Sequence, residues 1–158
     1  MGGLSMKSIA LGWDPNAKEM KEAVKKVLIE MGYQVEDYGS EDPIYANVAF
    51  RVAEAVAAGK QERGILICGT GIGMSIAANK VLGAYAALVS DAYSAERAAL
   101  SNDANIITLG AQTLGIEHAK ALVKIWMQNY YKPGSRSEPK VNRIKEYDRE
   151  REDVHKKG

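Results

Sequence analysis

The stretch of sequence that decides the fold is GILICGTGIGMSIAANK, residues 64–80. Its apolar start ends at Cys68, a glycine-rich turn follows at residues 69–73, and small residues at helical spacing come next. This order predicts a buried strand that enters a helix through a tight turn. In an open α/β sheet that junction lies at the carboxyl edge, where ligands bind. Because glycines let the backbone approach a ligand and free N–H groups favour anions, we expect a reactive thiol beside an anion site.

Composition and charge limit the class of protein. A chain of 158 residues, 46% hydrophobic and 26% charged, is typical of one soluble globular domain with a buried core. The net charge of +1 gives no general electrostatic reason to bind nucleic acid or a membrane, and no apolar run is long enough to span a bilayer. A single cysteine excludes an intrachain disulfide framework and fits a reducing, cytoplasmic compartment. Residues 1–5 resemble a tag remnant ahead of Met6.

The rest of the chain alternates predicted strands and helices. Apolar runs and amphipathic stretches predict strands at residues 8–11, 34–38, 64–68, 85–89 and 105–109, and helices at residues 18–31, 48–58, 72–81, 94–100 and 116–130. Repeated strand–helix units imply a single Rossmann-like (flavodoxin-like) α/β domain, residues 6–130, with a five-stranded parallel sheet and helices on both faces. A C-terminal arm at residues 131–158 carries a charged helix from Pro139 to about Glu150.

Chemically active side chains lie near the ends of several predicted strands. Asp14 follows the first strand, and Cys68 and Thr70 follow the third. Asp91 follows the fourth strand, and Asn102 lies just before the fifth. We expect these residues to gather at the carboxyl edge of the sheet, with cations nearby at Lys80, Arg136, Lys140 and Arg143. A thiol base, backbone amides, a hydroxyl-binding carboxylate and a basic arm suit proton transfer on a small phosphorylated polyol.

Four sequence motifs occur in a fixed order along the chain. They are ICGTGIGMSIAANK at residues 67–80, DAYSAE at residues 91–96, NDAN at residues 102–105, and the glycine-bounded turn at residues 110–115. In order and spacing they resemble the family of ribose-5-phosphate isomerase B and galactose-6-phosphate isomerase, and the similarity extends from residue 7 to about residue 144. A glycine-rich turn alone is weak evidence for a family, whereas an ordered match of this length is specific evidence. The resemblance implies an aldose–ketose isomerase of sugar phosphates that uses no cofactor and no metal.

The resemblance also implies a role for each matching residue. Cys68 would be the base that moves a proton between C1 and C2 through a cis-enediolate, and the hydroxyl of Thr70 would stabilise the enediolate oxygens. Asp14 and Asn102 would hold substrate hydroxyls. Further substrate contacts are expected from the turn and from a tyrosine: Gly69, Gly71, Gly73, Met74, Ser75 and Tyr45.

The same resemblance implies a function for the C-terminal arm and an oligomeric assembly. Arg136 and Lys140 match two phosphate-binding arginines of the family, with Ser135 as an insertion before them. Family members are dimers or larger and share their sites across the dimer interface. The implied partners are therefore a small sugar phosphate and further copies of this chain, as a homodimer or homotetramer.

Three positions depart from the family pattern. Ribose-5-phosphate isomerases of this type carry histidines where this chain has Pro15 and Ser101, and often an arginine where it has Gln112. The second of these histidines is credited with opening the furanose ring, which needs an acid–base group near neutral pH. A four-carbon aldose phosphorylated on O4 has no ring to open. Residues 93–108, YSAERAALSNDANIIT, are similar to the erythrulose-4-phosphate isomerase branch, so we expect D-erythrulose 4-phosphate and D-erythrose 4-phosphate as substrates.

The residues leave other interpretations open. The same chemistry could act on ribose 5-phosphate or a related pentose or hexose phosphate, or the domain could bind a phosphate ligand without catalysis. Asp14 could be only a helix N-cap, and Thr70 and Asn102 only turn residues. Arg136 and Lys140 could form a solvated surface arm.

Overall fold

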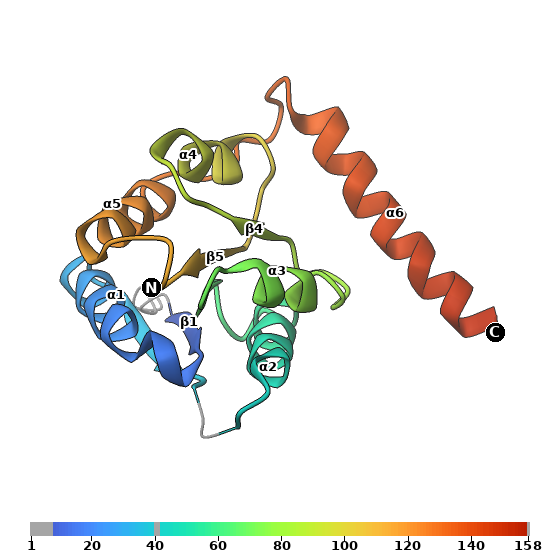
Figure 1. Cartoon of the computed structure of the whole chain (residues 1–158). Coiled ribbons are helices and arrows are strands. Elements are labelled where there is room, and N and C mark those ends of the chain that lie inside the picture. The colour runs from blue at the N-terminus through green and yellow to red at the C-terminus, as the bar shows by residue number, and fades with distance from the viewer. Residues whose placement is uncertain (1–7, 40–41, 158) are drawn as a thin grey trace, which may run out of the picture.

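The computed structural model describes residues 8–39 and 42–157, with side chains described up to residue 151, so the predicted tag remnant at residues 1–5 lies outside the described residues. The described chain forms strands and helices in alternation (Figure 1). In order they are β1 (Ser8–Trp13), η1 (a 3-10 helix, Pro15–Ala17), α1 (Lys18–Glu30), β2 (Gln34–Asp37), α2 (Tyr45–Ala57), β3 (Arg63–Cys68), α3 (Ile72–Ala78), β4 (Ala86–Leu88), α4 (Ala92–Leu100), β5 (Ile106–Gly110), α5 (Ile116–Met127) and α6 (Glu138–Lys157).

The strands form one parallel sheet between two layers of helices. The strand order is β2-β1-β3-β5-β4, and every neighbouring pair is parallel. Helices α1, α4 and α5 cover one face, and α2 and α3 cover the other (Figure 1). The predicted five-stranded Rossmann-like class is therefore confirmed, with the last two strands exchanged relative to the 2-1-3-4-5 order of flavodoxin itself. This exchange makes β5 the neighbour of the central strand β3.

The central strand β3 directs Cys68 toward one of the two helical layers. All six residues of β3 are buried, as expected for a parallel strand covered on both faces. Successive strand residues point to opposite faces. Ile65 and Ile67 pack in the core cluster beneath α1 and α5, whereas Leu66 and Cys68 pack in the cluster beneath α2 and α3. The thiol therefore lies on the α2–α3 side at the carboxyl end of the sheet.

Four helices differ from their predicted bounds by three residues or more, and two of them end early, α3 at Ala78 and α5 at Met127. Helix α2 begins at Tyr45 instead of residue 48, because the Asp42 carboxylate accepts hydrogen bonds from Ile44 N and Asn47 Nδ2 and so orders the helix entry. Helix α6 continues to Lys157 instead of ending near residue 150. Ion pairs at i,i+3 spacing, such as Arg143 with Glu146, support a helix that has little apolar surface.

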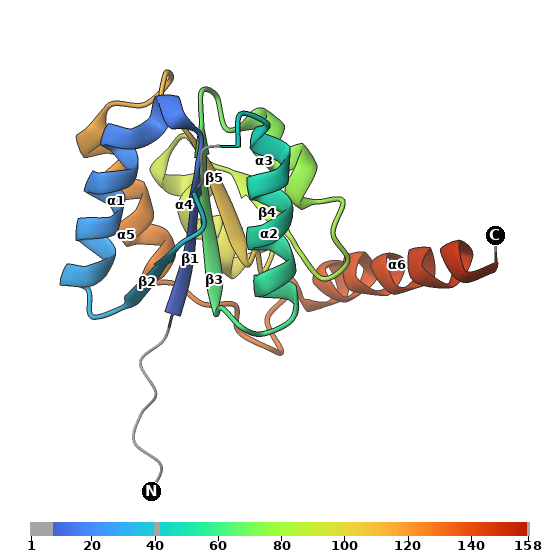
Figure 2. The same cartoon turned by 90° about the horizontal axis from the view of Figure 1, so that it is seen from below.

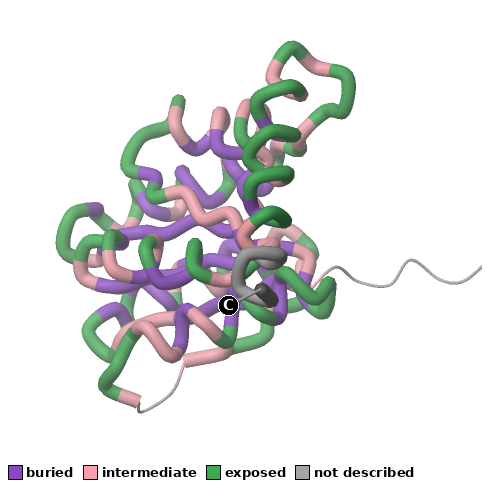
Figure 3. The backbone as a smooth tube through the Cα atoms, turned by 90° about the vertical axis from the view of Figure 1, so that its right-hand side faces the viewer, coloured by how far each residue is buried: buried purple, intermediate pink, exposed green. Residues whose placement is uncertain are grey.

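Helix α6 projects from the body of the domain. Figure 2 shows that it starts near the amino ends of the strands and runs away from the sheet, and Figure 3 shows that most of its described residues are exposed. Among these residues Val141 is an exception, with only 2% of its surface exposed. The start of α6 therefore packs on the domain, whereas one side of its later turns is not covered by other described residues.

A buried arginine joins the central strand to the end of α5. Arg63, 6% exposed, donates hydrogen bonds to Trp126 O at 2.8 Å and to Asn129 O at 2.7 Å. Its guanidinium also lies 4.4 Å from the centre of the Trp126 ring and 4.1 Å from that of Tyr130. Carbonyl groups at a helix C-terminus need such donors when they are buried. Arg63 thus fixes the point from which the C-terminal arm departs.

We expect Arg63→Met to lower the free energy of unfolding by about 2–3 kcal/mol, because it leaves two carbonyl oxygens at the end of α5 without their charged donor. The measurement is urea denaturation followed by circular dichroism. Lys120→Gln is the matched control, since Lys120 forms an i,i+3 pair with Glu117 on the surface of α5. The control should change stability by less than about 0.5 kcal/mol. Equal losses for both variants would contradict the capping role of Arg63.

Candidate functional site

Cys68 ends β3 in the middle of the carboxyl edge of the sheet. Its side chain is buried, with 5% of the residue exposed, and its Sγ accepts a hydrogen bond from Gly71 N at 3.2 Å. The backbone around it is held by Ala111 N, which donates to Cys68 O at 2.8 Å, and by Gln112 N, which donates to Gly69 O at 2.9 Å. The sulfur thus faces the turn, and the N–H of Gly71 points toward it.

The turn after Cys68 depends on one glycine in a left-handed conformation. Gly71 has φ +82° and is the N-cap of α3. A Cβ at Gly71 would lie 3.1 Å from the carbonyl carbon of Leu109, so the turn packs directly on the backbone of β5. Thr108 Oγ1 also donates to Gly71 O at 2.8 Å from inside the core. Only glycine satisfies both the dihedral angle and this close approach.

Four amides of this turn have no acceptor among the described residues. They belong to Gly69, Thr70, Gly73 and Met74. The amide of Ser75 is different, because it donates to Gly71 O at 3.2 Å as the first helical bond of α3. The predicted amide cradle is therefore narrower than residues 69–75. Free N–H groups beside a thiol can hold an oxyanion that forms during a reaction.

Some side chains around the turn face the site, and others pack in the core. Thr70 is exposed, and its Oγ1 accepts from Ile72 N at 3.3 Å, which leaves its hydroxyl hydrogen for a ligand. Met74 is fully buried in the core, so only its backbone faces the turn. Tyr45 lies over Gly73, because a Cβ there would be 2.2 Å from the Tyr45 hydroxyl oxygen. Tyr45 is 40% exposed and forms a wall of the turn from α2.

Asp14 lies beside the same edge. Its N–H donates to Ile67 O at 2.9 Å, next to Cys68, and its Oδ1 accepts from Asn16 N at 2.8 Å. The residue is thus the N-cap of η1, one of the two roles that the sequence allows. The cap uses Oδ1 and leaves Oδ2 for a substrate hydroxyl. Cys68, the turn, Tyr45 and Asp14 are named the thiol half-site below.

Trp13 next to Asp14 is held by a cluster of polar contacts. Its Nε1 donates to Asp37 Oδ1 at 2.7 Å, and the Lys21 ammonium lies 4.3 Å from the centre of its ring. Burial alone would raise the pKa of the Asp37 carboxyl, but hydrogen bonds from Trp13, Gly39 and Lys21 hold it below its usual value. The charged cluster therefore fixes the end of β1, from which Asp14 extends.

Asn102, Arg136 and Lys140 do not lie with Cys68 at the carboxyl edge of the sheet. Helix α4 runs back from the carboxyl edge, so Asn102 lies at the amino edge, before β5. The five residues of β5 separate the two edges by about 16 Å. The expectation that Asn102, Arg136 and Lys140 gather with Cys68 within one chain is therefore wrong, because a crossover helix must return the chain to the start of the next parallel strand.

These residues instead meet one another in a second place, named the basic half-site. A cavity of about 440 Å³ lies between α4 and the start of α6. It is lined by Tyr93, Arg97, Ser101, Asn102, Arg136, Ser137, Lys140, Val141 and Ile144. The structure thus brings together three of the predicted residues, Asn102, Arg136 and Lys140. Arg97 was missed as a site residue, although it precedes Ser101 by one helical turn in the motif at residues 93–108.

Two anchors hold the arm over this cavity. Lys145 Nζ donates to Asp103 Oδ2 at 2.6 Å, and Asp103 is in a left-handed conformation with φ 49°. Asp148 accepts from Gly83 N at 2.8 Å and from the Tyr85 hydroxyl at 2.9 Å. Burial raises the pKa of the Asp148 carboxyl, but these bonds and Arg151 bring it below its usual value. Burial and the Asp148 bond together raise the pKa of Tyr85 to about 12.

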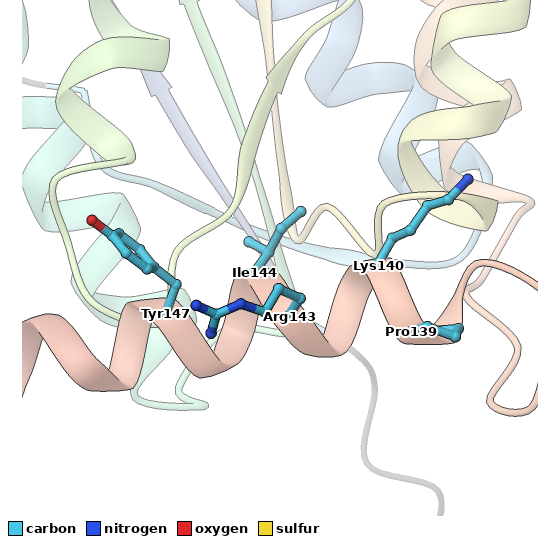
Figure 4. Close-up of a pocket in the computed structure, with 5 residues that line it drawn as sticks. All are labelled: Pro139, Lys140, Arg143, Ile144 and Tyr147. Carbon is cyan, nitrogen blue, oxygen red and sulfur yellow. The ribbon is translucent and has the colours of Figure 1, made fainter.

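A groove of about 640 Å³ follows α6 beyond the basic half-site. Figure 4 shows its lining residues, which all come from this one helix: Pro139, Lys140, Arg143, Ile144 and Tyr147. Lys140 and Ile144 point the same way from the helix (Figure 4). Ile144 is 50% exposed and Tyr147 is 60% exposed, so this side of α6 leaves apolar surface uncovered within one chain.

Two further kinds of site are not found within the described residues. No group of three or more histidine, cysteine, aspartate and glutamate side chains is placed to hold a metal ion. None of the described helices combines the length and apolar character that crossing a membrane requires.

Comparison with known proteins identifies the class. The family model described as Ribose/Galactose Isomerase matches residues 9–144. The chain is 46% identical to D-erythrulose-4-phosphate isomerase of Pectobacterium atrosepticum, covering 90% of this chain and 96% of that protein. It is 43% identical to ribose-5-P isomerase B of Listeria innocua, covering 89% and 96%. Type B ribose 5-phosphate isomerase of Trypanosoma cruzi has a similar structure, with TM-score 0.87, 33% identity, and coverage of 93% of this chain and 99% of that one.

The fold, the two half-sites and these relatives define an aldose–ketose isomerase of sugar phosphates. The chain belongs to the Ribose/Galactose Isomerase family. The resemblance found in the sequence is thereby confirmed, and the interpretation as a non-catalytic binding domain gives way to an enzyme.

We expect Gly71→Ala to lower the free energy of unfolding by about 1–3 kcal/mol, because its φ of +82° and the Leu109 backbone leave no room for a side chain. Gly73→Ala, two residues further along the same turn, is the matched control. There the new Cβ meets only the far end of the exposed Tyr45 ring, which can swing aside, so the cost should stay below about 1 kcal/mol. Urea denaturation measures both, and equal costs would contradict a turn that packs on β5.

Proposed function

We propose that this isomerase interconverts D-erythrose 4-phosphate and D-erythrulose 4-phosphate, with Cys68 as the base. The observation that carries the proposal is the thiol half-site, where the Cys68 sulfur lies beside the four unbonded amides of the turn. A base next to an oxyanion site is what proton transfer alpha to a carbonyl requires.

The reaction is a pair of proton transfers. The Cys68 thiolate, held by Gly71 N–H, removes the proton from C2 of the aldose, and the electron pair of that bond forms the C1–C2 double bond of a cis-enediolate. The turn amides and the Thr70 hydroxyl stabilise the negative charge on the oxygens. The Cys68 thiol returns the proton to C1 while the hydroxyl proton of O2 passes to O1, which gives the C2 carbonyl and the C1 hydroxyl of the ketose. Tyr45 forms a wall of this site, and Asp14 holds a substrate hydroxyl.

The complete site needs two copies of the chain. Cys68 and the basic half-site lie at opposite edges of one sheet, yet a phosphorylated tetrose is far shorter than the roughly 16 Å between those edges. A second copy can supply Asn102, Arg136 and Lys140 to the Cys68 of the first, and the symmetric contact does the same in reverse. Uncovered apolar residues on α3 and α6, including Ile72, Ile76 and Tyr147, support such a homodimer.

The choice of a tetrose as the substrate rests on the residues at the two positions where ribose-5-phosphate isomerases of this type carry histidines. Pro15 and Ser101 occupy the two places next to Asp14 and Asn102, and neither side chain titrates near neutral pH. His118 is exposed in the first turn of α5 and does not line the cavity of the basic half-site. The second candidate is ribose 5-phosphate, which the similarity to ribose-5-P isomerase B of Listeria innocua favours. A catalytic thiol also suits a reducing cytoplasm, which we propose as its location.

Turnover of the two substrates tests the function. We expect kcat/KM for D-erythrose 4-phosphate to exceed that for D-ribose 5-phosphate, and Cys68→Ala to lower kcat by roughly 10²–10⁴-fold because the base is lost. Ketose formation is measured by a coupled assay, and urea denaturation checks that the variant is folded. Turnover of ribose 5-phosphate alone would show that the substrate is the pentose phosphate and not the tetrose phosphate. Full activity of Cys68→Ala would refute the role of the thiol as the base.

Mixing two inactive variants tests the shared site. Cys68→Ala lacks the base and Lys140→Ala lacks a phosphate contact, so each homodimer should have low activity. After subunit exchange about half of the dimers are mixed, and each mixed dimer has one intact site of two. Activity should therefore recover to about a quarter of the wild-type value. Mixing two batches of the same variant is the control, and no recovery despite verified exchange would show that each site belongs to one chain.

A further inference from the structure

A third cation lines the basic half-site besides the two that the sequence indicates. Arg97 lies in the last turn of α4 and borders the same 440 Å³ cavity as Arg136 and Lys140. The three side chains come from two separate elements, α4 and the C-terminal arm. Among the described residues the one carboxylate paired with Arg97 is Glu96, at 3.6 Å, which does not line the cavity. The cavity lining therefore carries an excess of positive charge.

The Arg97 guanidinium has a fixed direction. Its Nε donates to Ser101 Oγ at 2.6 Å, across one turn of the helix. A guanidinium has five N–H donors in a planar fork, so this bond leaves the donors of both terminal nitrogens. Neither terminal nitrogen makes a hydrogen bond to the described residues, since the Glu96 contact is longer than 3.5 Å. One edge of the fork is thus anchored by Ser101, while the other is open to a ligand.

The alternative explanation is a purely structural one. A basic residue in the last turn of a helix interacts favourably with the helix dipole, and Arg97 stands at that position. This effect requires neither an orienting hydrogen bond nor two further cations across a cavity. Arg97 also has only a third of its side-chain surface exposed, so it is not a freely solvated cation.

We propose that Arg97 is an anion-binding residue of this enzyme and that Ser101 is the residue that positions it. The proposal rests on the proposed function and deepens it. The ligand is the terminal dianionic group of the substrate, a phosphate monoester, which a planar fork binds through two parallel hydrogen bonds. Ser101, in the place of an acid–base group, then serves as the acceptor that aims Arg97, and the site selects substrates by their anionic end.

The test measures phosphate binding and turnover separately on the full chain. Inorganic phosphate is titrated by calorimetry, and KM and kcat are measured with D-erythrose 4-phosphate. We expect Arg97→Met to raise both the Kd of phosphate and KM at least tenfold with little change in kcat. Arg97→Lys keeps the charge without the fork and should give an intermediate rise. Ser101→Ala should raise both constants by roughly two- to fivefold, because the guanidinium remains but loses its anchor.

Lys120→Met is the matched control, since Lys120 forms an i,i+3 pair with Glu117 on α5 outside the cavity. It should leave the Kd of phosphate and KM unchanged. If Arg97→Met lowers only the melting temperature and leaves both constants unchanged, Arg97 is structural and the proposal is overturned. If the wild-type protein turns over no sugar phosphate but binds inorganic phosphate through Arg97, the proposed reaction fails while the anion site stands.

Discussion

The parallel direction of all five strands is the constraint on which the rest of this structure depends. Each parallel strand must be entered from the same edge, so every crossover helix carries the chain back across the sheet. Strand β3 therefore delivers Cys68 to one edge, and α4 returns the chain so that Asn102 lies at the other. The separation into a thiol half-site and a basic half-site follows directly from this topology, and it is the reason for proposing a site that two copies of the chain share.

Different kinds of interaction stabilise the two half-sites. The thiol half-site is built by close packing, because Gly71 lies against the backbone of β5 and Tyr45 lies against Gly73. The basic half-site is built by charge, because Lys145 and Asp148 bind the arm to the turns before β4 and β5. Packing of this kind does not depend on salt, whereas partly exposed ionic contacts are screened. The attachment of the arm at the basic half-site is thus the part of the structure that should depend on ionic strength.

Local patterns predicted most of the fold, and the misses have specific causes. The apolar run before Cys68 and the glycines after it give the strand, the turn and the start of α3 where they were expected. Helix α6 is longer than predicted, because spaced ion pairs extend it where apolar periodicity is absent. Arg97 was missed as a site residue, because its position in the last turn of a helix is also explained by the helix dipole.

The sequence by itself determined the α/β class, the thiol at the end of a buried strand, the glycine turn beside it and the isomerase family. These features are contiguous in the chain, so local spacing is enough to specify them. Only the tertiary structure decided that Asn102, Arg136 and Lys140 share a cavity with Arg97, and that this cavity lies away from Cys68. Such contacts join residues distant in sequence, and they depend on strand order and on the direction of each crossover, which no local pattern contains.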